Sequence, residues 1–321
     1  MRILGRVICY SNRLVEESVL ESLIDRFNHF PLIIYGPEGC GKTTLMRYLT
    51  RRLGSKNYTS LYINALEYNV AKALEFRGPV INSIIRDLLR DIGGPLPSIL
   101  SNIVQLIVDK IWVKLKSLGN GLFIVIDDVY KAIGLENVDR YTKLVYEWIS
   151  WKASEYTNKL LVVITTSEGA SKRILVRHTY TRVSLIWNMD YGSYEEFIEQ
   201  LEPRIRVDEA YSITGGNPRL TIELAEYSWD TKKLMSVYEE KIKKILQETS
   251  IKPSKLQSLV EDPDSEPKTA RILEDAGLMI ELYRTTSISQ PKPSTELGIG
   301  KEWAWQTPLY KNIVQEYIKK P

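Results

Sequence analysis

Short apolar runs alternate with helical patterns through the first 190 positions of the chain. Two of the runs, residues 122–126 and 160–165, consist almost entirely of Leu, Ile, Val and Phe, which is typical of central parallel strands covered on both faces. Stretches with apolar residues at helical spacing lie between the runs. This order of elements predicts an α/β domain around a five-stranded parallel sheet. The five strand-like runs cover residues 32–35, 58–63, 122–126, 160–165 and 181–186.

The longest helical stretch lies between the second and third of these runs. It covers residues 79–118 and is predicted to form two helices that are broken at Gly93-Gly94-Pro95. Its segment at 96–108 has no charged residue, but it is too short to cross a bilayer and contains Ser, Asn and Gln. We interpret this segment as a buried helix, and we expect no membrane-spanning segment.

Beyond residue 190 the pattern changes to helices without strands, which predicts a small helical domain that would act as a lid. From residue 261 the order changes again and becomes that of the second half of a winged helix. A helix at 267–276 precedes strand-like runs at 278–283 and 302–306 and a closing helix at 309–318. Trp303 and Trp305 alternate in the second of these runs, so one of them is expected to face the core. We therefore expect three domains, at residues 1–190, 191–248 and 249–321.

A glycine-rich loop directly after the first run matches the pattern GxxxxGK[ST], which is typical of nucleoside triphosphate binding. Its glycines let backbone N–H groups approach a phosphate chain closely, and the following helix N-terminus adds partial positive charge. Lys42 is expected to reach the β and γ phosphates, and the Thr43 hydroxyl is expected to bind Mg²⁺. The candidate contacts of ATP or ADP are Gly36, Pro37, Glu38, Gly39, Cys40, Gly41, Lys42, Thr43 and Thr44.

Composition and charge narrow the class of protein. With 321 residues, of which 44% are apolar and 26% charged, the chain is long enough for two or three globular domains. The formal net charge of +3 gives no general field for nucleic acids, so any basic surface is local. A disulfide at Cys40 would hinder nucleotide entry, which favours a reducing environment. Since the N-terminus also lacks the apolar core of a signal peptide, we expect a cytoplasmic protein.

Two carboxylates, Asp127 and Asp128, end the third run. A phosphate-bound Mg²⁺ needs an acidic group at the end of a neighbouring strand, and Asp127 is the candidate for that contact. Asp128 is then placed to orient or deprotonate the attacking water. The alternative is that the two aspartates merely end a strand as turn residues or as a helix N-cap.

Hydroxyl residues end the fourth run, and cations follow them. In a five-stranded P-loop sheet, the strand inserted beside the phosphate-loop strand delivers a polar residue to the γ-phosphate. Thr166 is the candidate for this sensor, with Thr165 and Ser167 as register alternatives, although hydroxyl clusters are also common at strand ends without function. Arg173 is a catalytic candidate that could stabilise transition-state charge in cis or across a subunit interface; the alternative is a surface arginine.

These motifs, in this order, resemble those of the archaeal P-loop ATPases of the STAND group, which are relatives of AAA+ proteins. The resemblance includes two further segments, Tyr10-Ser11-Asn12-Arg13 followed by Glu16, and Thr214-Gly215-Gly216-Asn217-Pro218-Arg219 in the lid. It implies that Tyr10 and Arg13 belong to the adenine contact and that Pro218 packs near the adenine or ribose.

Two positions depart from the STAND pattern. Arg219 could act like the sensor-2 arginine of AAA+ lids, a role that the STAND group usually lacks. Leu14 and Val15 stand where acidic residues are frequent in the group. The second departure concerns the adenine contact and leaves the phosphate chemistry untouched.

The sequence favours an ATPase that binds ATP and hydrolyses it slowly or on stimulation by a partner, with closure of the lid coupled to nucleotide state. Self-association or a protein partner is compatible with such a switch. A small-molecule phosphotransferase is a further alternative, but it would need an acceptor pocket and lid arginines close to the phosphates.

The main alternative is a DNA-binding ATPase that resembles replication initiators and applies its winged helix to duplex DNA. Residues 231–260 carry seven lysines against three glutamates, which is the clearest local basic bias. A solvated helix face explains these lysines equally well. In the candidate recognition helix, Glu274 and Asp275 lie beside Lys268 and Arg271 and would repel a phosphate backbone.

Overall fold

The chain divides into two compact units in the computed structural model. The first, here called the sheet unit, comprises residues 14–35 and 42–184, and the second, the helical unit, comprises residues 1–13, 36–41 and 185–321. The structure describes residues 2–11, 13–56, 58–77, 121–155, 157–167, 169–283 and 288–319. The predicted helices of residues 79–118, with the uncharged segment 96–108, lie outside the described residues.

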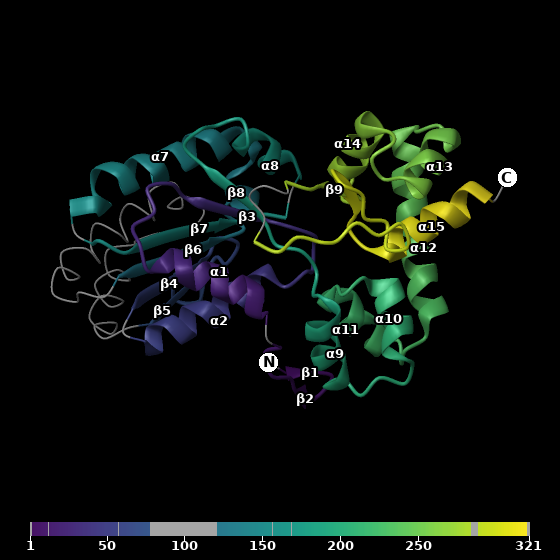
Figure 1. Ribbon diagram of the computed structural model, residues 1–321, viewed down its shortest axis with the longest axis horizontal. Helices are drawn as coiled ribbons and strands as arrows, with labels where there is room; N and C mark the ends of the chain where they lie inside the picture. Colours follow the sequence, from purple (N-terminus) through teal and green to yellow (C-terminus); the bar gives the residue numbers. More distant parts are fainter. Residues whose placement is uncertain are drawn as a thin grey trace. The chain divides into compact units, whose positions relative to one another are not determined.

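The sheet unit is built on a six-stranded, mostly parallel sheet with the order β5-β4-β6-β7-β3-β8 (Figure 1). β4, β6, β7 and β3 pair in parallel, while β5 pairs antiparallel with β4 at one edge. The side chains of β6 and β7 are buried throughout, as expected of central strands. The strands are β3 (Leu32–Tyr35), β4 (Thr59–Asn64), β5 (Leu74–Arg77), β6 (Leu122–Asp127), β7 (Leu160–Thr165) and β8 (Arg182–Leu185).

The prediction of five parallel strands was one strand short. All five predicted runs form strands, and the omitted strand is β5, whose sequence is Leu-Glu-Phe-Arg. Leu74 and Phe76 are buried, whereas Glu75 is half-buried and Arg77 exposed. An antiparallel edge strand needs only one apolar face, so these four residues show no continuous apolar run.

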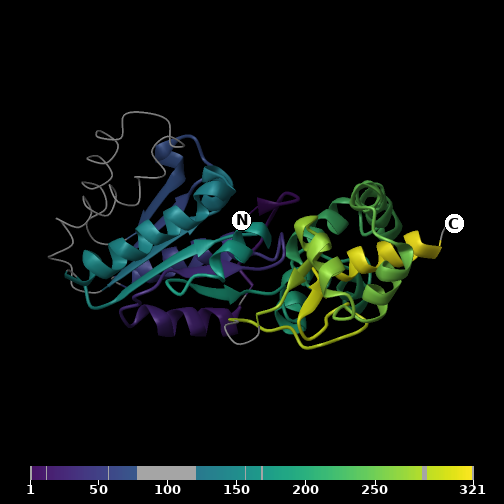
Figure 2. The same cartoon turned by 90° about the horizontal axis from the view of Figure 1, so that it is seen from above.

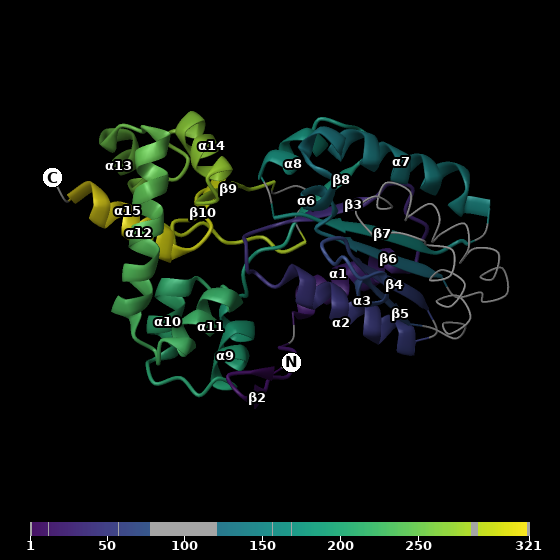
Figure 3. The same cartoon turned by 180° about the vertical axis from the view of Figure 1, so that it is seen from behind.

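Helices cover both faces of this sheet, with α1 and α2 on one side and α7 and α8 on the other (Figures 1 and 3). α2 begins at Lys42, directly at the end of the phosphate-loop motif, and buries its apolar residues at helical spacing. The helices are α1 (Leu14–Ile24), α2 (Lys42–Ser55), α3 (Val70–Ala73), α6 (Val129–Ile133), α7 (Val138–Trp151) and α8 (Gly169–Leu175), with short 3₁₀ turns at Leu135–Asn137 and Ala153–Glu155.

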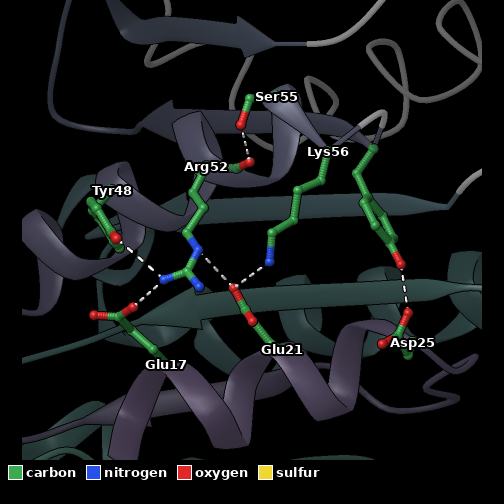
Figure 4. A network of polar contacts seen from close by, with 8 residues as sticks. Glu17, Glu21, Asp25, Tyr48, Arg52, Ser55 and Lys56 are labelled. Atoms are coloured by element: carbon green, nitrogen blue, oxygen red, sulfur yellow. Dashed lines mark hydrogen bonds and ion pairs between the residues drawn. The ribbon is translucent and has the colours of Figure 1, made fainter. Parts of the chain in front are cut away.

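A polar network joins α1 to α2 (Figure 4). Arg52 Nη1 lies 2.5 Å from Glu17 Oε2, and Arg52 Nε lies 3.1 Å from Glu21 Oε1. Lys56 Nζ contacts the same Glu21 oxygen at 3.2 Å. The Glu17 side chain is only 5% exposed, whereas that of Lys56 is 49% exposed. Arg52 is therefore the cation that neutralises the buried carboxylate of this network.

The helical unit packs its helices and two small hairpins around one apolar core. α15 packs against α12 and α13 (Figures 1 and 2), and β9 pairs antiparallel with β10. The predicted boundaries at residues 190 and 248 remain predictions. The elements are β1 (Arg2–Ile3), β2 (Arg6–Val7), α9 (Tyr191–Glu199), α10 (Val207–Thr214), α11 (Pro218–Glu226), α12 (Thr231–Thr249), α13 (Pro253–Glu261), α14 (Pro267–Asp275), β9 (Met279–Glu281), β10 (Trp303–Trp305) and α15 (Pro308–Lys319).

Both tryptophans of β10 are buried, which corrects the expectation that only one faces the core. Trp303 is 2% exposed and Trp305 is fully buried. Residues two apart in a strand point to the same face, so the spacing places both rings on the core side. The Trp305 indole N–H donates to the Leu259 carbonyl of α13 at 3.2 Å, which satisfies its polar atom inside the core.

Within the described residues, every helix is too short or too polar to cross a bilayer.

We predict that Arg52→Gln lowers the free energy of unfolding by about 1–3 kcal/mol, because it removes the 2.5 Å ion pair with the buried Glu17 carboxylate. The matched change Lys56→Gln removes an exposed partner and should cost at most about 0.5 kcal/mol. Urea denaturation of the full chain, followed by circular dichroism, measures both values. Equal effects of the two substitutions would contradict this account of the network.

Candidate functional site

The carboxylate of Asp127 lies at the carboxyl end of β6 and accepts hydrogen bonds from three hydroxyl groups. Thr43, in the first turn of α2, donates to Asp127 Oδ2 at 2.8 Å, and Tyr62 of β4 donates to the same oxygen at 2.5 Å. Thr165, the last residue of β7, donates to Oδ1. Asp127 is 3% exposed, so these donors replace the water that its charge has lost. The structure thus brings together the two predicted Mg²⁺ ligands, Thr43 and Asp127.

The donor set at Asp127 fits Mg²⁺ held jointly with a phosphate. Because Thr43 uses its O–H to contact Asp127, the lone pairs of the threonine oxygen remain for a cation. Carboxylate and hydroxyl oxygens are the hard ligands that Mg²⁺ prefers, usually with phosphate and water completing the shell. Among the described residues, no three His, Cys, Asp or Glu side chains form a group that could hold a metal without such help.

Tyr62 was not identified from the sequence as a site residue. Burial raises the pKa of its phenol strongly, and the neighbouring Asp127 charge raises it further. The phenol therefore stays protonated and remains a donor to Asp127. A tyrosine in a strand is an ordinary β-sheet residue. Its role depends on strand register. β4 pairs with β6 so that Asn64 lies opposite Asp127, and Tyr62, two residues earlier, shares a face of β4 with Asn64.

Asp128 adopts a left-handed backbone conformation, with φ of 55°. It occupies the N-cap position of α6, as the structural alternative supposed, but its side chain makes no capping hydrogen bond. Its backbone N–H donates to Thr165 Oγ1 at 3.3 Å. A left-handed conformation costs an L-residue about 1–2 kcal/mol, and such conformations cluster at functional sites.

The phosphate loop approaches other backbone segments of the helical unit so closely that side chains would not fit. A Cβ atom on Gly36 would lie 1.9 Å from the Ile186 carbonyl oxygen. At Gly39, where φ is 78°, a Cβ atom would lie 2.6 Å from Cβ of Arg219. These glycines are therefore required by the fold of the loop itself, in addition to any approach of phosphate.

Arg13 supports the phosphate loop through backbone carbonyls. Its side chain is buried and donates to the Cys40 carbonyl at 2.7 Å and to the Trp187 carbonyl at 2.5 Å. Arg13 and Pro218 also both lie beside Gly41, because a Cβ atom there would be 3.6 Å from Arg13 Nη1 and 3.9 Å from Pro218 Cγ. Two of the three residues that the resemblance assigns to the nucleoside thus adjoin the loop.

Other candidate contacts differ in exposure. Lys42 is 8% exposed, Thr44 is exposed and Tyr10 is half-buried. Both cysteines are free thiols, Cys9 exposed and Cys40 buried.

The hydroxyl side chains at the end of β7 lie in two different environments. Thr165, one of the register alternatives, contacts Asp127, whereas the Thr166 hydroxyl lies 2.7 Å from the Ser171 hydroxyl of α8. Arg173 is half-buried on α8. Its neighbour Lys172 is 1% exposed, with its ammonium 5.2 Å from the ring centre of Tyr35. The structure thus places Thr165 rather than Thr166 beside the carboxylate.

Residues 10–224, more than half of the chain, match the model of a family described as an ATPase domain predominantly from Archaea. The chain belongs to this family. The family match and the mostly parallel sheet support a P-loop ATPase. No curated protein matches the sequence.

Several solved structures are similar to this chain at low identity. A replication initiator DnaA bound to AMPPCP and single-stranded DNA is 17% identical, with 76% of this chain and 69% of that chain covered and a TM-score of 0.40. An AMPPCP-bound DnaA from Aquifex aeolicus is 16% identical, with the same coverage and a TM-score of 0.35. A RuvB variant from Thermotoga maritima is 17% identical over 86% of this chain and 91% of that chain, with a TM-score of 0.41.

We predict that Gly39→Ala destabilises the protein by about 1–2 kcal/mol or more, because alanine is strained at a φ of 78° and its Cβ would meet Arg219. Gly192→Ala is the matched control within the same unit. Its Cβ would lie 3.4 Å from the nearest side-chain atom, and alanine suits the first turn of α9. Thermal unfolding of both variants tests the difference, and equal midpoints would count against a rigidly shaped loop.

Proposed function

We propose that this protein is an ATP-binding and ATP-hydrolysing switch. The observation that carries the proposal is the hydrogen bond from Thr43 to Asp127, which joins the end of the phosphate-loop motif to the carboxylate at the end of β6. Membership of an ATPase family supports the same conclusion. The finer assignment to the STAND group rests on the motif resemblance, as does the arrangement of an ATPase domain at 1–190, a lid at 191–248 and a winged-helix-like domain at 249–321.

The phosphate loop, residues 36–44, binds the phosphates of ATP in this proposal. Backbone N–H groups and the N-terminus of α2 meet the negative charge, and Lys42 contributes a point charge to the β and γ phosphates. Arg13 and Pro218, which both adjoin Gly41, place the nucleoside at that end of the loop together with Tyr10.

Thr43 and Asp127 hold Mg²⁺, which when bound neutralises charge on the β and γ phosphates. Tyr62 and Thr165 fix the direction of the Asp127 carboxylate. Asp128 orients the attacking water or accepts its proton. Thr166 remains our candidate for sensing the γ-phosphate, and Arg173 for stabilising transition-state charge.

We predict that Lys42→Ala abolishes ATP binding, because it removes the cation that meets the phosphates. Asp128→Asn should keep ATP binding but lower turnover by about a hundredfold or more, because it removes the group that acts on the attacking water. Calorimetry with ATP and Mg²⁺ measures the affinity, and release of phosphate measures the turnover. Undiminished affinity of Lys42→Ala would refute the loop assignment. Surviving turnover in Asp128→Asn would place the base elsewhere.

Binding of duplex DNA is a second candidate function, supported by the orientation of Glu274. This carboxylate is 3% exposed and accepts the N–H of Glu281 in β9 at 3.0 Å, so it does not face solvent. The side chains on the exposed face of α14 include Lys268, Arg271 and Asp275. Of the two carboxylates expected to repel a phosphate backbone, only that of Asp275 is therefore exposed.

For this candidate we predict that replacing Lys268 and Arg271 together by Ala weakens duplex binding and lowers the slope of log affinity against log salt by about 2. Replacing Arg140 and Lys143 of α7 by Ala removes the same charge from the sheet unit and serves as the control. A gel shift at low salt gives the first answer. No shift with the unaltered protein would eliminate DNA binding.

A further inference from the structure

The main-chain groups of Glu38, in the middle of the phosphate loop, are held by two amide side chains from distant parts of the chain. The Glu38 N–H donates to Gln306 Oε1 at 2.9 Å, and the Glu38 carbonyl accepts from Asn217 Nδ2 at 2.8 Å. Asn217 is 1% exposed and Gln306 is 6% exposed. Both hydrogen bonds are part-buried, but the two amides that make them are buried, and a buried amide is costly to leave without its partner.

The two amides are themselves fixed by hydrogen bonds within the helical unit. Asn188 Nδ2 donates to the main-chain carbonyl of Gln306 at 2.9 Å, and Asn188 Oδ1 accepts from Asn217 Nδ2 at 3.0 Å. Asn217 Oδ1 accepts the N–H of Leu220 and so caps α11. The Gln306 backbone N–H donates to the Leu278 carbonyl at 3.0 Å, and its side-chain Nε2 donates to the Met279 carbonyl at 3.4 Å. The two side chains therefore reach Glu38 from a preformed network and not as flexible surface groups.

We propose that Asn217 and Gln306 are positioning residues, which hold the phosphate loop in the shape that receives a triphosphate. The inference rests on the proposed function, since it concerns the same loop. A loop with glycines at 36, 39 and 41 has many conformations, and ordering it on binding would cost affinity. Holding Glu38 by both its N–H and its carbonyl removes much of that freedom before the nucleotide arrives.

In this proposal the held loop is the binding-competent state and not a blocked one. The two amides engage Glu38, upstream of the residues Lys42 and Thr43 that begin α2. In the same structure, the Thr43 hydroxyl already contacts Asp127. Release of the loop should therefore weaken nucleotide binding and not strengthen it.

Substitutions at Asn217 separate the contact with the loop from the cap of α11. Asn217→Asp and Asn217→Ser both keep an oxygen for the Leu220 N–H, but the ionised Asp carboxylate has no proton to donate, and the shorter Ser hydroxyl should not reach the Glu38 carbonyl. Gln306→Met keeps a similar volume and removes the acceptor for the Glu38 N–H. Asn69→Asp, at the N-cap of α3, is the matched control, because the Asn69 side chain likewise accepts a capping hydrogen bond, from Lys72 N, and lies outside the phosphate loop.

We expect each Asn217 variant and Gln306→Met to weaken the affinity for ATP with Mg²⁺ by about tenfold, which corresponds to one or two lost hydrogen bonds. Asn69→Asp should leave the affinity unchanged. Calorimetry on the full chain measures the affinity, and thermal midpoints check that each variant is folded.

Alkylation of Cys40 gives a second readout that needs no nucleotide. Cys40 lies in the phosphate loop and is fully buried, while Cys9 is exposed and serves as a reference in the same molecule. Loosening of the loop should raise the rate of Cys40 alkylation at least several-fold and leave the rate at Cys9 unchanged. Mass spectrometry of the two peptides follows both thiols in one sample.

The outcomes distinguish this inference from the proposed function. If the unaltered protein fails to bind ATP, the proposed function is wrong, but faster Cys40 alkylation in the variants would still establish that the amides hold the loop. Unchanged Cys40 alkylation together with unchanged or tighter ATP binding would overturn the inference. If Asn217→Asp does not fold, the uncharged Asn217→Ser and Gln306→Met decide the question.

Discussion

A buried carboxylate that is surrounded by hydroxyl donors is the interaction on which the candidate site depends. Asp127 has almost no access to water, and its charge is stable there because Thr43, Tyr62 and Thr165 donate to it. These donors come from α2 and from the two strands that flank β6. The charge of one side chain therefore fixes four elements of the sheet unit at one edge of the sheet. The same constraint sets the direction in which the Thr43 oxygen can bind a cation.

The phosphate loop is fixed in a different way, through its main chain. Arg13 binds the Cys40 carbonyl, and Asn217 and Gln306 bind the peptide groups of Glu38. None of these contacts uses a side chain of the loop; the Glu38 carboxylate separately pairs with Arg219 at 2.7 Å. The common feature is that a flexible, glycine-rich segment receives its shape from buried polar groups outside it.

The sequence was sufficient for the central strands, and its short motifs supplied the candidate ligands of the site, which remain predictions. Strands buried on both faces have continuous apolar runs, and the phosphate-loop motif and the aspartate pair each occupy a few consecutive residues. β5 was missed because an edge strand has only one apolar face. Tyr62 and Gln306 were missed because their roles depend on strand register and on contacts between residues far apart in sequence. Asn217 was visible as a residue before proline in a glycine-rich motif, but its contact with Glu38 was not.

The omitted strand β5 also determines how the sheet ends. It is four residues long, and its Glu75 carboxylate forms ion pairs with Arg47 at 3.1 Å and Arg51 at 3.3 Å. A short edge strand that carries paired charges is a poor template for a strand from another molecule. Among the described strands, this edge of the sheet is therefore protected against edge-to-edge aggregation, which matters for a protein with several continuous apolar strands.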